Sequence, residues 1–168
     1  MKRIIFIVLI CMVAIFVAVA QEHNPKSTNN DSLPRFASFR DEIVNARSGP
    51  GTKYPIDWVY KQKHAPVEII AEFENWQRIR DWENSESWVM KQLLTKKRYV
   101  KVITPGENNL YIKDNYKSKI IARIEDDVIG EVKKCPADNN FCLVSFNHYE
   151  GWISRQNLYG IYDNEIID

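Results

Sequence analysis

The octapeptide Asn45-Ala46-Arg47-Ser48-Gly49-Pro50-Gly51-Thr52 carries the sharpest structural signal in the chain. Gly49 and Gly51 tolerate a positive φ angle, and Pro50 fixes its own φ. The octapeptide therefore predicts a strand that ends in a stiff, tight loop. On both sides of this loop, short apolar segments alternate with turn residues.

The apolar segments have the texture of β-strands. Several alternate with a period of two and are rich in β-forming residues: 42–47, 67–72, 76–82 and 87–89. Gly, Pro, Asn and Ser separate them, as turns require. No window has a long amphipathic helical pattern, and only 90–94 is expected to form a helical turn. The sequence predicts an all-β chain.

The pattern recurs about 65 residues later, which indicates an internal repeat. The expected correspondences are 44–48 with 110–114, 68–70 with 131–133, 76–79 with 141–144, 87–89 with 151–153, and Leu93 or Leu94 with Leu158. We expect two domains, at residues 36–96 and 97–162. The seam at Thr95–Arg98 is so short that the two domains are expected to pack or pair side by side.

The N-terminal residues predict export. A basic start at Lys2-Arg3, the apolar run Ile4–Val17 and the small residues Ala18-Val19-Ala20 are typical of a signal peptide covering residues 1–20. Removing its 20 residues from 168 leaves 148, with 21 Lys and Arg against 22 Asp and Glu. The polar residues 21–35 are expected to form a disordered spacer.

Charge and hydropathy exclude two classes of partner. A nearly neutral mature chain argues against a dedicated nucleic-acid binder, which needs a basic face. No second apolar run reaches the roughly 18 residues of a membrane span, so no stable span is expected after cleavage. The protein is therefore expected to be periplasmic or secreted.

The mature chain keeps two cysteines, Cys135 and Cys142. Export and the turn-rich residues between them favour a disulfide across a hairpin. A zinc pair or a nucleophile is the alternative, but zinc usually needs four ligands and the only nearby imidazole is His148. We therefore expect no metal.

These motifs resemble the bacterial SH3 domain family. Asn45–Gly51 is similar to its opening motif, and Trp76 with Ile79 and Ser87-Trp88-Val89 are similar to its later strand and hairpin end. Tyr54–Tyr60 and Pro66–Ile70 are also similar to exported double-SH3 proteins of alphaproteobacteria. The resemblance implies two tandem SH3-like small β-barrels. Phe141 replaces the tryptophan in the second unit, which lacks the Ser-Gly-Pro-Gly turn.

Tryptophans at the hairpin ends, Trp88 and Trp152, are expected to pack into the barrel cores. The aromatic residues outside the core pattern are Tyr54, Trp58, Tyr60 and Trp82, with Tyr111, Tyr116 and Tyr149 as looser counterparts in the second unit. In an extended strand, Trp76 and Trp82 would share one face with Arg78 and Arg80.

Two interpretations of this aromatic and cationic face remain open. It can stack on sugars or hold an extended peptide. Alternatively, its groups form cation–π contacts with one another, or the second domain buries them.

Catalysis is not expected, because no nucleophile has a positioned partner and no phosphate loop or cofactor motif is present. The family resemblance implies a non-catalytic exported binding module with peptidoglycan or its stem peptide as ligand. The alternative is a periplasmic adaptor that binds another protein.

Overall fold

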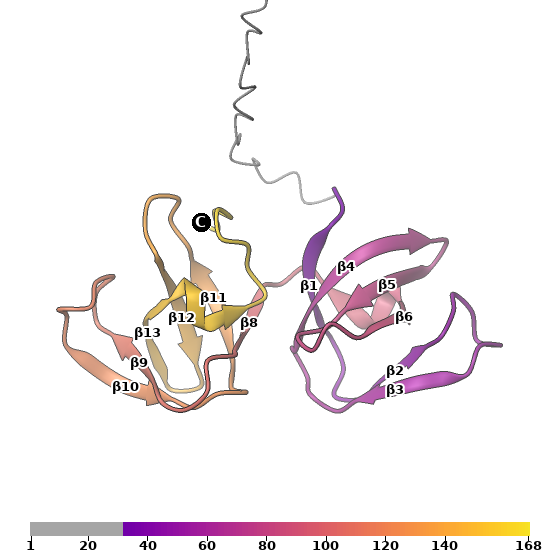
Figure 1. The fold of residues 1–168 in the computed structure, drawn as a ribbon, viewed down its shortest axis with the longest axis horizontal. Helices are drawn as coiled ribbons and strands as arrows, with labels where there is room; N and C mark the ends of the chain where they lie inside the picture. Colours follow the sequence, from indigo (N-terminus) through magenta and orange to yellow (C-terminus); the bar gives the residue numbers. More distant parts are fainter. Residues whose placement is uncertain (1–31) are drawn as a thin grey trace, which may run out of the picture.

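The computed structural model describes residues 32–168, and these form two seven-stranded antiparallel sheets (Figure 1). The expected signal peptide, at residues 1–20, and most of the expected spacer lie outside the described residues. Among the described residues, no helix is both long and apolar enough to cross a membrane. The prediction of an all-β chain is confirmed.

The two sheets follow one another along the chain. The first contains β1 (Arg35–Phe39), β2 (Val44–Arg47), β3 (Ile56–Tyr60), β4 (Pro66–Phe73), β5 (Trp76–Arg80), β6 (Glu86–Met90) and β7 (Leu94–Thr95). The second contains β8 (Tyr99–Val102), β9 (Asn108–Tyr111), β10 (Ile120–Ile124), β11 (Ile129–Lys134), β12 (Phe141–Phe146), β13 (Tyr149–Ser154) and β14 (Leu158–Tyr159). A 3-10 turn precedes the last strand of each: η1 (Lys91–Leu93) and η2 (Arg155–Asn157).

The strand orders show that the two sheets have the same topology. The orders are β3-β2-β6-β5-β4-β1-β7 and β10-β9-β13-β12-β11-β8-β14, so each strand of the first sheet has a counterpart in the second. Strands β3 and β10 are the counterparts at one edge. The predicted tandem repeat is confirmed.

Register tests the predicted correspondences residue by residue. Ile69 pairs with Ile79 as Val132 pairs with Val144, which supports two of the expected matches. The expected match of Val44 with Leu110 is wrong by two residues. Val44 pairs across to Tyr60 as Asn108 pairs across to Ile124, so Asn108 is the structural counterpart of Val44.

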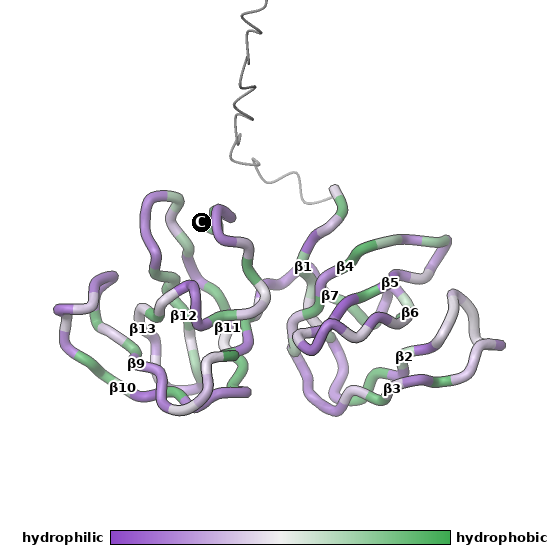
Figure 2. Tube along the Cα trace, viewed as in Figure 1, coloured by the Kyte–Doolittle hydropathy of each residue, from purple (hydrophilic) through white to green (hydrophobic). Residues whose placement is uncertain are grey.

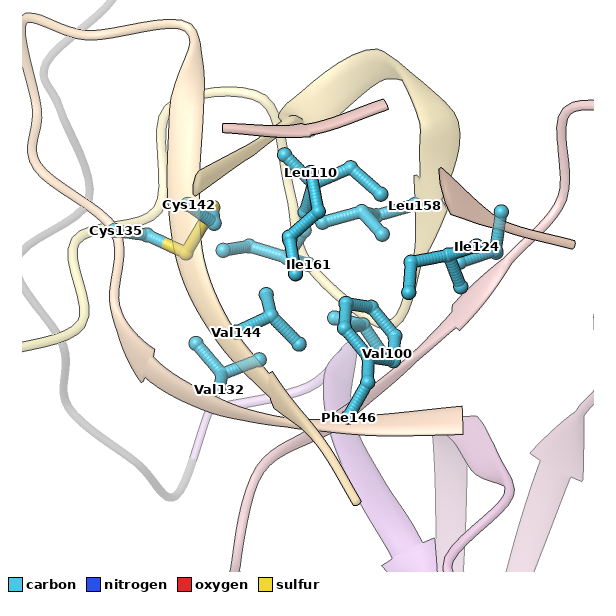
Figure 3. Packing of buried hydrophobic residues seen from close by; sticks show 12 residues of the cluster. Val100, Leu110, Ile124, Val132, Cys135, Cys142, Val144, Phe146, Leu158 and Ile161 are labelled. Carbon is cyan, nitrogen blue, oxygen red and sulfur yellow. A yellow bond between two sulfur atoms is a disulfide. The ribbon is translucent and has the colours of Figure 1, made fainter. Parts of the chain in front are cut away.

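Each sheet encloses its own core, because strand side chains alternate between a buried and an exposed face. In β6, for example, Ser87 and Val89 are buried while Glu86 is exposed. Figure 2 shows apolar and polar stretches interspersed along both units. Figure 3 shows the second core, where Val144, Leu110 and their neighbours pack together.

The predicted disulfide is confirmed: Cys135 and Cys142 are bonded, with 4.4 Å between their Cα atoms. Both cysteines are fully buried and belong to the second core. Figure 3 shows the bond at the edge of this core.

The C-terminal segment, residues 161–168, folds back onto the second domain beyond its last strand. Ile161 enters the core, and Ile167 forms a β-bridge with Cys135 through two backbone hydrogen bonds of 2.7 and 3.1 Å. Buried Arg155 donates to the carbonyl oxygens of Tyr162 and Glu165 at 2.9 and 2.8 Å. The segment thus continues the domain past residue 162, where the sequence analysis ended it.

Aromatic contacts join the two domains. The ring of Phe36, in β1, lies 4.6 Å from that of Tyr162 and 5.2 Å from that of Tyr159. The Arg98 guanidinium in the linker lies over Phe36 at 5.7 Å. His64 of the first domain stacks on Tyr99 of the second at 4.1 Å. The prediction that the short linker packs the domains together agrees with these contacts.

Polar groups add to this interface. The Tyr162 hydroxyl donates to Glu68 Oε1 at 2.8 Å, and the Tyr159 hydroxyl donates to the Arg80 carbonyl oxygen at 2.9 Å. Burial, helped by the charge of Glu68, raises the pKa of both tyrosines above its ordinary value. Both phenols are therefore neutral donors at physiological pH.

Candidate functional site

The outer surface of the first sheet carries a row of side chains that crosses four adjacent strands. Register places Arg47 opposite both Ile56 and Trp88, and Trp88 opposite Arg78. Because the flanking Ser87 and Val89 are buried in the core, Trp88 faces outward. We call this set the outer row: Ile56, Arg47, Trp88 and Arg78. It places Trp88 between two arginines on adjacent strands.

Ion pairs hold part of this surface in place. Arg78 contacts Glu86 at 2.7 Å, and Arg80 contacts Glu86 at 2.8 Å and Glu68 at 3.3 Å. A hydrogen bond from Arg80, together with the charge of Arg78, keeps the pKa of Glu86 below its ordinary value. Glu86 and Glu68 therefore partly neutralise the arginines of this surface. Its aromatic and apolar side chains are left as the main groups for contact with a ligand.

The loop after β2 is stiff. Arg47 Nη1 donates to the Tyr54 carbonyl oxygen at 2.7 Å, and the Ser48 amide donates to the Pro55 oxygen at 3.1 Å. A Cβ atom built on Gly49 would lie 2.5 Å from the Tyr54 ring, so only glycine allows this close packing. The loop signal in the sequence thus has a structural cause, and it places half-buried Tyr54 against the loop.

Trp58 is the exposed aromatic residue among the first-domain candidates. It lies on edge strand β3 opposite Ala46, and 53% of its surface is exposed. Ile56 and Val59 on the same strand are 45% and 46% exposed. An edge strand with exposed apolar side chains offers both ring contacts and backbone hydrogen bonds to a ligand.

Two of the expected ligand-binding residues are internal. Tyr60 packs on Phe39 at 4.8 Å and donates to Asp81 at 2.9 Å, and only 9% of it is exposed. Burial and the hydrogen bond with Asp81 raise its pKa above the ordinary value. Trp76 is 8% exposed. Neither residue presents a ring to a ligand.

Trp82 does not share the face of Arg78 and Arg80, contrary to the prediction from strand parity. Strand β5 ends at Arg80, because the Asp81 carboxylate accepts the amides of Glu83 and Ser85 and starts a turn. Trp82 packs against the first core, and Lys101 of the second domain lies 3.8 Å from its ring centroid. This is the alternative in which the second domain covers the residue.

Trp88 and Trp152 also differ from expectation. Both are half-buried on the outer side of their sheets and belong to neither core cluster. Aliphatic side chains such as Ile79 and Ile153 fill the cores instead. Arg47 and Trp88 are thus site residues that sequence reasoning missed. The Asn-Ala-Arg and Ser-Trp-Val motifs could have revealed them, because strand alternation in each motif places Arg47 and Trp88 on the outer face of adjacent strands.

The second domain has a different outer row. Its counterparts of Arg47 and Arg78 are Tyr111 and Leu143, which register places on either side of Trp152. Tyr116, 63% exposed, contacts Tyr111 and Phe141 edge-on at 6.0 and 4.7 Å. Tyr149 is also exposed, at 55%. This surface is aromatic without flanking guanidiniums, so the two domains present different chemistry.

The described residues contain no cluster of three or more His, Cys, Asp or Glu side chains that could hold a metal ion. Each of the two sheets presents an outer row of side chains, and the first sheet adds a stiff loop. Rigid strands that present side chains in this way are suited to binding a ligand.

The family-level comparison agrees with this arrangement. A family model for the bacterial SH3 domain matches residues 40–96 and again residues 104–160. The chain belongs to the bacterial SH3 domain family. Bacterial SH3 domains are in general cell-wall or peptidoglycan-binding modules, and they are often extracellular or periplasmic.

No curated protein matches this bacterial SH3 chain. Two solved structures that it is similar to are NlpC2 and NlpC1 from Trichomonas vaginalis, at 17% and 15% identity and a TM-score of 0.34 each. The matches cover 75% and 79% of this chain and 48% and 47% of theirs. The chain thus spans about half the length of either protein.

Proposed function

We propose that this chain is a non-catalytic, exported module that binds peptidoglycan or its stem peptide through the first domain. The outer row carries the proposal, since register places Trp88 between Arg47 and Arg78 on the outer face of the sheet. An indole stacks on the apolar face of a sugar ring, and each guanidinium keeps N–H donors beyond its bond to Tyr54 or Glu86 that can reach a stem-peptide carboxylate. Trp58, on the neighbouring edge strand, lies opposite buried Ala46 and so offers a second, exposed ring at the edge of the sheet.

Family membership supports the cell-wall part of the proposal, because bacterial SH3 domains are in general wall-binding modules. The signal peptide expected at residues 1–20 supports a periplasmic or secreted location, where peptidoglycan is accessible. No catalytic role is proposed for any residue.

Retention on purified peptidoglycan sacculi tests this function. We expect the folded chain to sediment with sacculi and Trp58→Ala to weaken retention about 2- to 13-fold, since one aromatic contact is worth roughly 0.5–1.5 kcal/mol. Trp58 is half-exposed, so its removal leaves the core intact. Tyr149→Ala removes an equally exposed ring from the second domain and is the matched control, with unchanged retention expected. A wild-type chain that stays in the supernatant contradicts the proposal.

The second candidate function is a periplasmic adaptor, and the edge strand β3 favours it. Ile56 and Val59 are exposed on a strand that has a partner on one side only, which is the arrangement used in strand addition. Failure to bind sacculi, combined with a co-purifying protein that Trp58→Ala releases, would support this candidate over wall binding.

A further inference from the structure

A pocket of about 320 Å³ lies in the first domain beside β1, β4, β5 and the η1–β7 segment. Buried side chains of Ile69, Leu94 and Gln77 line one part of it. The rest of the lining includes four cations, which we call the rim cations: Arg35, Arg40, Lys91 and Lys96. Gln77 and the outer-row residue Arg78 point to opposite sides of β5, so this pocket is separate from the outer row.

The pocket lining carries excess positive charge at Arg40 and Lys91. Glu72 is the acidic group that pairs with Arg35, and it also accepts a hydrogen bond from Gln77 at 2.7 Å. Among the described residues, neither Arg40 nor Lys91 forms a salt bridge. Arg40 and Lys91 therefore add positive charge that the Arg35–Glu72 pair does not balance, and an anionic ligand is electrostatically favoured.

The equivalent position in the second domain is occupied by a peptide segment, which indicates what the first-domain pocket can bind. Ser38 pairs with Thr95 in the first domain, and Lys101 pairs with Tyr159 in the second, so Ser38 and Lys101 are counterparts. Three residues earlier along the chain, Arg35 and Arg98 are therefore counterparts as well. Likewise η1 and η2 make Arg155 the counterpart of Lys91. At this place the second domain holds its own C-terminal segment.

The bonds to that segment are specific. Arg98 pairs with the Glu165 carboxylate, one of its two bonds measuring 3.0 Å. Arg155 donates to the backbone carbonyls of Tyr162 and Glu165. Ile161 and Ile167 pack on the core beneath. One cation thus binds an acidic side chain, the other binds backbone carbonyls, and aliphatic side chains fill the apolar part.

We propose that the first-domain pocket binds an extended acidic segment of a partner polypeptide, in the way that the second domain binds residues 161–167 of its own chain. Lys91 would then contact the backbone carbonyls of the segment, and Arg35 and Arg40 its carboxylate.

The chain that follows β7 does not fold back over this pocket, so the pocket remains accessible to another molecule. After β14 the chain turns back across the second domain, and Gly160, at φ 111°, permits that turn. After β7 the chain instead continues through Lys96–Arg98 into β8. The first domain also has more positive charge here than its counterpart, because Arg40 and Lys96 stand where the second domain has Ile103 and Gly160.

The probe for this site is a synthetic acetylated peptide with the sequence of residues 161–168, Ile-Tyr-Asp-Asn-Glu-Ile-Ile-Asp. Its binding to the full folded chain is followed by the backbone amide NMR shifts of the chain. We expect saturable shifts at Gln77 and Leu94, and at least tenfold weaker binding for a peptide carrying Glu165→Gln. Shifts confined to the second domain, or no saturable shifts, would overturn the proposal.

Lys91→Glu is the decisive protein variant, because Lys91 is exposed and its replacement disturbs no core contact. We expect it to weaken peptide binding at least tenfold, and Arg40→Gln to weaken it severalfold. Lys117→Glu makes the same charge change on an exposed loop of the second domain, and binding within twofold of wild type is expected.

Two further outcomes decide the identity of the ligand. Inorganic phosphate that competes with the peptide at equal concentration would show a simple anion site and overturn the peptide assignment. A dimer in sedimentation velocity that Lys91→Glu dissociates would assign the pocket to a second copy of this chain and overturn the partner assignment. Sacculus retention unchanged by Lys91→Glu would keep this site distinct from the proposed wall-binding surface.

Discussion

Phe36→Ala should uncouple the two domains. Phe36 is the residue whose ring contacts Tyr159, Tyr162 and Arg98 together. Each aromatic pair is worth about 0.5–1.5 kcal/mol beyond buried area, and the cation–π contact about 0.5–1 kcal/mol. We therefore expect the variant to lose about 2–3 kcal/mol of unfolding free energy, most of it from the interface.

Differential scanning calorimetry measures this coupling directly. The wild-type chain is expected to unfold in one transition whose calorimetric and van't Hoff enthalpies agree. For a cooperative unit of this size, a loss of 2–3 kcal/mol lowers Tm by roughly 6–10 °C. Phe36→Ala is also expected to separate the transition into two, because each core would then unfold independently.

Phe73→Ala is the matched control, since it removes the same ring from the same sheet at a position that is 52% exposed. It should leave one transition and change Tm by no more than a few degrees. A single unshifted transition in Phe36→Ala would refute the reasoning, as would a wild-type chain that already melts in two steps.

Alkaline pH and the disulfide give two further predictions. The pKa values of Tyr159 and Tyr162 are raised by burial, so the folded state keeps both protons. Stability should be fully present below pH about 10 and fall as the pH rises above it. Urea titrations should show this loss in wild type and less of it in the double variant Tyr159→Phe, Tyr162→Phe, in which Tyr60 still keeps a raised pKa. Replacing Cys135 and Cys142 together by alanine should cost at least about 2–3 kcal/mol of unfolding free energy on the chain-entropy model. A variant as stable as wild type in urea would contradict that role for the bond.

Much of the fold could be predicted because local chemistry decides it. The Gly49 loop, the alternation in β5 and β6 and the Cys135–Cys142 hairpin are each determined by neighbours in sequence. The misplaced match at β9 has a physical reason. The second unit lacks the Gly-Pro-Gly loop that marks the end of β2, so no residue in it fixed the register.

The candidate sites were harder to predict, because they depend on pairing between distant strands. Arg47 and Trp88 are neighbours only through the β2–β6 ladder. Trp82 does not lie on the expected face, because the turn at Asp81 ends the strand before it. The pocket brings together cations from opposite ends of the first domain, Arg35 and Lys96 among them, and no local pattern connects these positions.

Arg98 touches residues near both ends of the folded chain, since it lies over Phe36 and pairs with Glu165. The first strand and the C-terminal segment therefore meet at one place, on the same side of the molecule in Figure 1. The two ends of the folded part of the chain are therefore close together in space, as circular permutation requires. A short peptide joining residue 168 to residue 32 should allow new ends at the exposed Gly106 turn, and such a circular permutant would separate the order of the domains along the chain from their packing.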